Sequence, residues 1–141
     1  MTPNLDEVFD RLKRLNQPVP RPLRLPTSSE VESVEKELGL SFHPDFRRFL
    51  EEVSDVVFGT IEPVTITNSE AHTHLATVIE DGRTFFNLPA DYTPICESNS
   101  DLYCVTLDGR VVFWPHNGTS DEAWANVGAW IEDVWIGDTG D

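Results

Sequence analysis

The chain has 141 residues, of which 39% are hydrophobic and fourteen are aromatic, and it carries a formal net charge of −15. A chain of this size and composition buries about two thirds of its unfolded surface in one core, so we expect a single compact domain. The aromatic content excludes a disordered acidic chain, and the charge disfavours binding to nucleic acid or to an anionic membrane.

The negative charge is confined to the later part of the chain. Residues 1–48 contain eight acidic and eight basic side chains, whereas residues 49–141 contain seventeen acidic side chains against Arg83 and Arg110. A field of one sign speeds the encounter of a small protein with an oppositely charged molecule by about 10- to 10³-fold. The distribution therefore predicts a basic protein as the partner.

The amino terminus shows neither a basic leader nor an apolar stretch, because Asp6 and Glu7 follow almost immediately. We therefore expect no signal peptide and no membrane span. The two cysteines are Cys96 and Cys104. Without an export signal, both are expected to be reduced and to pack as small apolar residues in a cytoplasmic protein.

The chain is expected to open with an amphipathic helix and a proline-rich strap. Apolar residues recur at helical spacing from Leu5 to Leu15, with charged residues between them. Four prolines then hold residues 18–26 extended, because proline lacks a backbone donor and disfavours helix in the residue before it. We expect this strap to lie on the surface.

Two further helices are expected to form a tight pair. The second helix closes at Gly39 and begins at one of two capping boxes with the required spacing, Thr27 with Glu30 or Ser29 with Glu32. The third helix begins at Pro44, where a first helical turn tolerates proline. Its buried face is expected to consist of Phe46, Phe49, Leu50 and Val53.

After the third helix the pattern changes to strand-forming residues. Residues 56–66 are rich in β-branched and aromatic side chains, interrupted by Gly59 and Pro63. This pattern predicts one or two strands, at least one of them at a sheet edge. Residues 69–83 have apolar side chains at helical spacing, which predicts another helix, and residues 84–92 are expected to form a loop.

The clearest strand signals lie in the second half of the chain. Three strands are expected over residues 93–97, 102–107 and 110–114, and they would form an antiparallel meander. Asp108 and Gly109 are interpreted as the two-residue turn of the last hairpin. A final helix is expected from Ser120, an N-cap with Asp121 and Glu122 in the first turn.

The order of these segments resembles the SUKH superfamily. Residues 30–39 and 44–50 are similar to the opening helices of that family. Residues 94–105, followed by residues 109–116, are similar to its later signature of a strand, a polar turn, an aspartate before an aromatic and a cysteine, and an aromatic strand. The closing helix with Trp130 and Ile131 is also similar to the terminal helix of the family.

The resemblance implies a single α+β domain, in which helices pack on a twisted, mostly antiparallel sheet of about five or six strands. It divides the chain into an N-terminal helix and strap (residues 1–26), a SUKH-like domain (residues 27–136) and a C-terminal tail (residues 137–141). The sequence does not decide whether the first helix packs on this domain or on a partner.

Many bacterial members of the superfamily are immunity proteins, and the resemblance implies that role here. Such a protein stays in the cytoplasm and binds and neutralises a cognate toxin, often a nuclease. A nuclease binds a polyanion, so its cleft tends to be basic and an acidic inhibitor can occupy it. The alternative is a regulatory interaction module that resembles the fungal Smi and Knr cell-wall regulators. Neither role requires catalysis or a cofactor.

Five acidic residues are candidates for the partner-binding surface. They fall in expected turns or at an expected helix start, where the backbone exposes side chains to solvent. The candidates are Glu97, Asp101, Asp108, Asp121 and Glu122. The plainer alternative is that these carboxylates only keep a small protein soluble.

Metal binding and catalysis have little support in the sequence. His72 and His74 would point to nearly opposite sides of a helix, and both a His-Glu-x-x-His motif and paired Cys-x-x-Cys motifs are absent, so no metal site is expected. Cys104 and His116 could form a thiol nucleophile with its base, but we interpret Cys104 as an inward-facing strand residue and His116 as a turn residue. A small hydrolase with two carboxylates in a deep cleft is a third alternative, and it requires a carboxylate of strongly raised pKa.

Overall fold

A computed structural model describes residues 4–21, 23–59, 61–98, 101–115 and 120–137. Residues 99–100 of the expected turn, His116 and residues 138–141 of the expected tail therefore lie outside the described residues. The helices are α1 (Leu5–Arg14), α2 (Ser28–Leu38), α3 (Pro44–Glu52), α4 (Leu75–Phe85) and α5 (Val127–Trp130), which continues as the π-helical segment η1 (Ile131–Ile136). The strands are β1 (Glu62–Pro63), β2 (Thr93–Ser98), β3 (Asp101–Val105), β4 (Val111–Trp114) and β5 (Ala123–Trp124).

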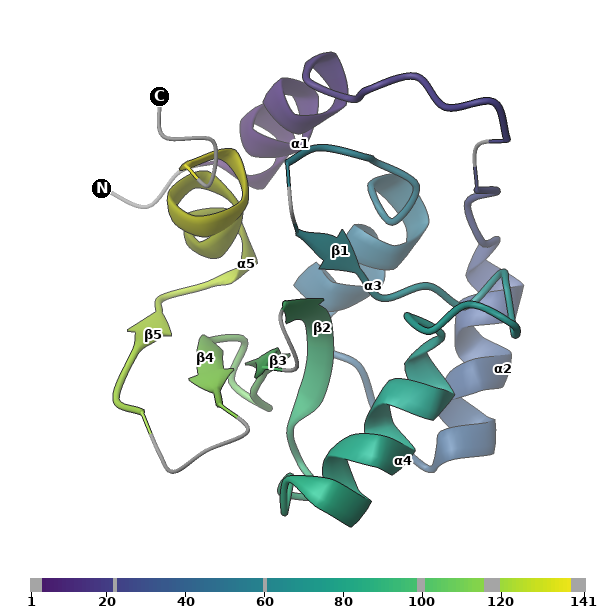
Figure 1. The fold of residues 1–141 in the computed structure, drawn as a ribbon, viewed down its shortest axis with the longest axis vertical. Coiled ribbons are helices and arrows are strands. Elements are labelled where there is room, and N and C mark those ends of the chain that lie inside the picture. The colour runs from purple at the N-terminus through teal and green to yellow at the C-terminus, as the bar shows by residue number, and fades with distance from the viewer. Residues whose placement is uncertain (1–3, 22, 60, 99–100, 116–119, 138–141) are drawn as a thin grey trace.

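The five strands form one antiparallel sheet in the order β1-β2-β3-β4-β5, with helices on both faces (Figure 1). Neighbouring residues of β3 show the two layers, because successive side chains of a strand point to opposite faces. Leu102 lies against Gly82 of α4, whereas the ring of Tyr103 lies 5.5 Å from that of Trp130 in α5. The expected α+β fold is confirmed. Among the described residues, the structure holds no helix long and apolar enough to cross a membrane.

The first three helices and their caps agree with the sequence. The side chain of Thr27 accepts a hydrogen bond from the Glu30 backbone, and the Glu30 carboxylate accepts one from Thr27, so the first of the two possible capping boxes is the one used. Gly39 ends α2 in the left-handed conformation, with φ of 67°. Pro44 occupies the first turn of α3.

The first helix packs on the rest of the domain. Val8, Phe9 and Leu12 are buried in the same core as the later helices and strands. On its exposed side, Arg11 lies 3.6 Å from Glu132 of η1. The N-terminal helix is therefore part of the hydrophobic core of the domain.

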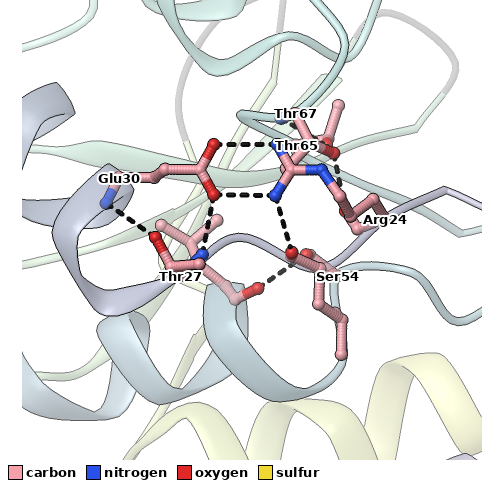
Figure 2. A network of polar contacts seen from close by, with 8 residues as sticks. Arg24, Thr27, Glu30, Ser54, Thr65 and Thr67 are labelled. Atoms are coloured by element: carbon pink, nitrogen blue, oxygen red, sulfur yellow. Dashed lines mark hydrogen bonds and ion pairs between the residues drawn. The ribbon is translucent and has the colours of Figure 1, made fainter.

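Hydrogen bonds hold both ends of the strap. At its start, the Gln17 backbone N–H donates to Val57 O (2.7 Å), and the Val57 N–H donates to the Asn16 side chain (2.8 Å). At its end, the guanidinium of Arg24 donates to both carboxylate oxygens of Glu30, at 2.7 and 2.8 Å, and Thr67 donates to Arg24 O at 2.7 Å (Figure 2). The Arg24–Glu30 pair thus joins the strap to the start of α2.

The fourth helix begins later than the sequence predicts. Helical spacing starts at Ser69, but α4 begins at Leu75. The backbone of the intervening residues is engaged elsewhere, because Thr65 N–H donates to Thr73 O at 3.0 Å and Leu75 N–H donates to Thr65 O at 2.8 Å. These contacts with a distant segment override the local helical pattern.

The hairpin between β3 and β4 has a three-residue loop, so the expected two-residue turn is wrong. Thr106 N–H donates to Arg110 O (2.9 Å), and Gly109 N–H donates to Thr106 O (3.1 Å), which leaves Leu107, Asp108 and Gly109 in the loop. Gly109 has φ of 89°, as expected for a turn followed by a bulge. The loop lies against His43, the N-cap of α3.

The last helix begins at Val127, so the expected start at Ser120 is wrong. The Ser120 hydroxyl does accept a hydrogen bond from Glu122 N–H (3.0 Å), but this closes a local turn. Phe113 N–H then donates to Glu122 O (3.1 Å), and Ala123 and Trp124 pair with β4 as a fifth strand. Asn126 caps the helix by accepting from Ala129 N–H at 2.8 Å.

The π-helical segment places two tryptophans in the core. Trp130 and Trp135 are both fully buried, with ring centroids 6.1 Å apart. Two residues five positions apart point in very different directions on a regular α-helix, whereas the wider π turn brings them to nearly the same face. Trp135 also donates its indole N–H to Phe58 O at 3.0 Å. The irregular turn therefore allows both rings to pack inward.

Substitution of Gly109 by alanine is expected to cost much more than the same change at Gly39. Both glycines have positive φ, and alanine there costs about 1–2 kcal/mol. A Cβ at Gly39 meets open space, but at Gly109 it would lie 2.5 Å from Nε2 of His43. Denaturant unfolding should show a larger loss of free energy for Gly109→Ala than for Gly39→Ala, and equal losses would contradict this turn geometry.

Acid should release the strap from α2. The hydrogen bond from Arg24, followed by that from Thr27 N–H, lowers the pKa of Glu30 from 4.5 to about 2. A lowered folded-state pKa means that this stabilisation is complete above about pH 4.5 and is lost as the pH falls towards 2. The Tm difference between the wild type and Glu30→Gln should therefore shrink over this range. Glu37→Gln, at the other end of α2, removes an equal charge and serves as the control.

Candidate functional site

Basic side chains are paired with acidic ones in the first part of the chain. Arg48 contacts Glu52 at 2.7 Å and also pairs with Asp6, and Arg47 lies 3.4 Å from Glu35. The same holds for Arg11 and Arg24, described above. Much of the acidic charge on these helices is therefore locally balanced.

The acidic side chains of the later part have few cations near them in sequence. Its two arginines have local roles: Arg83 donates to Ala90 O at 3.3 Å, and Arg110 pairs with Asp108, Nε to Oδ2, at 3.1 Å. Exposed carboxylates occur on α4, where Glu80 and Asp81 lie, and before β5, where Asp121 and Glu122 lie. Part of the unbalanced negative charge thus lies on α4 and before β5.

A shallow hollow of about 240 Å³ lies on the outer side of β4 and β5. Val112 and Trp114 of β4 share one face of the sheet, and Arg110, just before β4, continues the same alternation. The lining residues of the hollow are Tyr92, Arg110, Val112, Phe113, Trp114, Ser120, Asp121, Glu122 and Ala123. The hollow therefore combines aromatic rings, one guanidinium and two exposed carboxylates.

Hydrogen bonds fix the walls of this hollow. Trp114 donates its indole N–H to Phe86 O at 2.8 Å, and the rings of Tyr92 and Trp114 meet edge to face with centroids 5.8 Å apart. Arg110 is held by Asp108, whose carboxylate also accepts a hydrogen bond from the Thr106 hydroxyl. That hydroxyl first, and Arg110 next, hold the pKa of Asp108 below its usual range. The hollow is thus formed before any partner arrives.

The five candidate acidic residues do not form one cluster. Asp121 and Glu122 line the hollow, whereas Asp108 lies in the turn at the opposite end of β4 and orients Arg110. Asp101 begins β3, at the end of the sheet where β4 finishes. Glu97 lies opposite Glu62, on the far side of the sheet from β5.

Glu97 belongs to a second acidic group near β1. The Glu62 carboxylate forms a hydrogen bond with Nε2 of His72, which raises the pKa of the imidazole, and the charges of Glu62 and Glu97 add to this effect. His72 thus holds the segment before α4 against β1. Among the described residues, no group of three or more histidine, cysteine, aspartate or glutamate side chains is placed to hold a metal ion.

A separate hollow lies beneath the strap. Val19, Arg21 and Leu23 alternate along the strap and line a space of about 270 Å³ together with Asp55. Burial raises the pKa of Asp55, and the nearby Lys13 opposes this rise. Asp55 is therefore the residue that best matches the carboxylate of raised pKa that the hydrolase alternative requires.

Tyr92, Arg110 and Trp114 line the hollow, although no sequence motif marks them as parts of a site. The period of two along a strand is the signal that places Arg110 and Trp114 on one face. The position of Tyr92 depends on how the loop after α4 folds back on β4, which no local pattern in the sequence reveals.

The elements described above define a small α+β domain with a five-stranded antiparallel sheet. Residues 5–136 match the family SUKH_5, described as SMI1-KNR4 cell-wall, and the chain belongs to this family. The structure is similar to the crystal structure of a protein from Pseudomonas syringae pv. tomato, with 38% sequence identity and a TM-score of 0.88. That similarity covers 93% of this chain and 98% of the other. No curated protein matches the chain.

Removal of the Glu62 carboxylate should lower the pKa of His72. The hydrogen bond between them is the largest cause of the raised pKa, so in Glu62→Gln the imidazole should titrate closer to about 6.5. Because the folded-state pKa is raised, this pair stabilises the fold below pH 6.5 and loses its effect as the pH rises through the folded-state pKa. NMR titration of the imidazole protons measures the shift. Glu70→Gln serves as the control and should leave the titration unchanged.

Proposed function

We propose that this chain is an immunity protein, which binds and neutralises a cognate toxin through its acidic surface. The observation that carries the proposal is the distribution of charge: the exposed carboxylates on α4 and before β5 have fewer cations around them than those of the first helices, because Arg110, the guanidinium in the β4–β5 hollow, is paired with Asp108. A toxin that acts on nucleic acid presents a basic cleft, which complements this surface. The similar protein from a Pseudomonas supports a bacterial setting.

Asp121 and Glu122 are proposed as the principal toxin contacts. Both are exposed, and both line the hollow beside the rings of Tyr92 and Trp114. Glu97 and Asp101 are proposed as flanking contacts at the same end of the sheet, and Asp108 as a residue that keeps Arg110 oriented. In this arrangement, a fixed aromatic wall is surrounded by carboxylates, as in interfaces where aromatic anchors supply affinity and outer charges steer association.

Inhibition of this kind is stoichiometric and needs neither a catalytic group nor a cofactor in the inhibitor. We propose accordingly that the protein is not an enzyme and acts in the cytoplasm of the producing cell. The hydrolase alternative is supported only by the raised pKa of Asp55, which lies in a different hollow from Asp121 and Glu122. A regulatory interaction module is the second candidate, because the description of the matching family refers to the cell wall.

Growth rescue tests the immunity role. The toxin-like domain encoded beside this gene is expressed with the protein, and surviving cells are counted. Wild-type protein should restore growth. The double variant Asp121→Asn, Glu122→Gln should associate with the toxin about 10-fold more slowly than the wild type at low salt. The matched double variant Glu80→Gln, Asp81→Asn removes equal charge from α4 and should have a smaller effect. Added salt screens these charges, so it should reduce the difference in association rate between the wild type and the Asp121→Asn, Glu122→Gln variant.

Other outcomes of this experiment separate the three candidates. Rescue that is lost in Asp55→Asn, in a protein that still folds, would favour the hydrolase over stoichiometric binding. Folded wild-type protein that rescues cells from none of the neighbouring toxin domains would contradict the immunity role and favour the regulatory module. An association rate that does not respond to salt would overturn the acidic-surface mechanism even if rescue occurs.

A further inference from the structure

The outer edge of β5 has backbone groups that point away from the sheet. Ala123 lies opposite Val112, while Phe113 N–H donates to the oxygen of its neighbour Glu122 at 3.1 Å. In an antiparallel pair, residues alternate between those that bond to the partner strand and those that face outward. Since Glu122 bonds inward to β4, the N–H and C=O of Ala123 point outward.

This edge is open within the described part of the chain. β5 is the last strand of the sheet, and Asp121, Glu122 and Ala123 are all exposed. An uncovered strand edge is a template on which another extended chain can pair. The edge is short, because β5 consists of Ala123 and Trp124.

The opposite edge of the sheet differs. In β1, Val64 N–H donates inward to Ile95 O at 3.0 Å, so the alternation leaves Pro63 facing outward. Proline has no N–H, and the outer side of β1 therefore lacks a donor at this position. One edge of the sheet resists pairing, and the other offers both a donor and an acceptor.

The hollow adjoins the open edge on one face of the sheet. Ala123 and Asp121 line it together with Tyr92 and Trp114. A strand added beside β5 would direct alternate side chains to this face, and such pockets give specificity to strand addition. A lysine or arginine at that position meets Asp121, Glu122 and the aromatic rings, which attract a cation. The guanidinium of Arg110 also lines the hollow, but its charge is paired with that of Asp108.

We propose that the β5 edge pairs with an extended, basic segment of the toxin, which adds a sixth strand to the sheet and places a cationic side chain in the hollow. The inference rests on the proposed immunity function and specifies how the toxin is held. Charge favours this occupant over a second copy of the chain, because a second copy would bring another set of carboxylates in a protein of net charge −15 to the same edge.

The first test uses a synthetic peptide of alternating arginine and valine and needs no toxin. Amide hydrogen exchange of the labelled protein is followed during titration with this peptide. Protection of the Ala123 amide, with smaller changes at β1, is the expected result. Ala123→Pro removes the outward donor and should weaken peptide binding by about tenfold, whereas Ala123→Val keeps the donor and should bind the peptide more tightly than Ala123→Pro. Pro63→Ala, at the other edge, should leave the protection of the Ala123 amide unchanged.

The second test applies the same variants to toxin rescue, so that the two proposals can fail separately. Rescue that survives in a folded Ala123→Pro variant would overturn the strand-pairing mode and leave the immunity role intact. Peptide contacts confined to α4, or lost equally in the α4 double variant, would show charge attraction alone and overturn the proposal. Dimerisation of the free protein through β5, detected by light scattering, would also overturn it, because a second copy would then be the occupant.

Discussion

The packing of Trp130 is the contact on which the rest of the structure depends. Its buried ring meets Phe49 of α3, Tyr103 of β3 and Trp135 of η1, with centroids 6.4, 5.5 and 6.1 Å away. Burial of an aromatic ring of this size contributes about 3–5 kcal/mol, a large share of the stability of a small domain. One side chain thus joins the N-terminal helices, the sheet and the end of the chain.

This packing also determines where β5 lies. The chain passes from β5 into α5 through the Asn126 cap, so a helix fixed by Trp130 fixes the strand just before it. Trp124 strengthens the connection, because its ring lies 5.6 Å from that of Tyr103 and its N–H donates to Asp133 at 2.8 Å. The surface that we assign to the partner is therefore supported from behind by the largest side chains of the core.

Sequence reasoning succeeded where the signal is local. A capping box at the start of α2, Gly39 at its end and Pro44 in the first turn of α3 each depend on a few neighbouring residues, and all three are found. The sequence left open whether the box was Thr27 with Glu30 or Ser29 with Glu32, and the structure has the first. Sequence reasoning failed where a distant segment decides the outcome. Ser120 followed by two acidic residues is as typical of a short turn as of a helix start, and only pairing with β4 distinguishes them.

The candidate site shows the same division. Composition and turn residues predict that the carboxylates before β5 are accessible, but they do not predict which side chains lie beside those carboxylates. The arrangement of Tyr92, Trp114 and Arg110 around them requires the register of β4 and the path of the loop after α4, which are tertiary properties. The sequence also gave no sign that the final helix would widen into a π turn, because that change serves the packing of Trp135.

The reactivity of the two cysteines reports on unfolding of the domain. Cys96 and Cys104 are fully buried in adjacent strands at the centre of the sheet, and burial raises the pKa of the Cys104 thiol well above its ordinary value. Alkylating reagents react with thiolates, so Cys104 is unreactive until the sheet separates. Its rate of alkylation then follows excursions of the whole domain, and a bound partner that protects the fold would slow this chemistry without touching either sulfur.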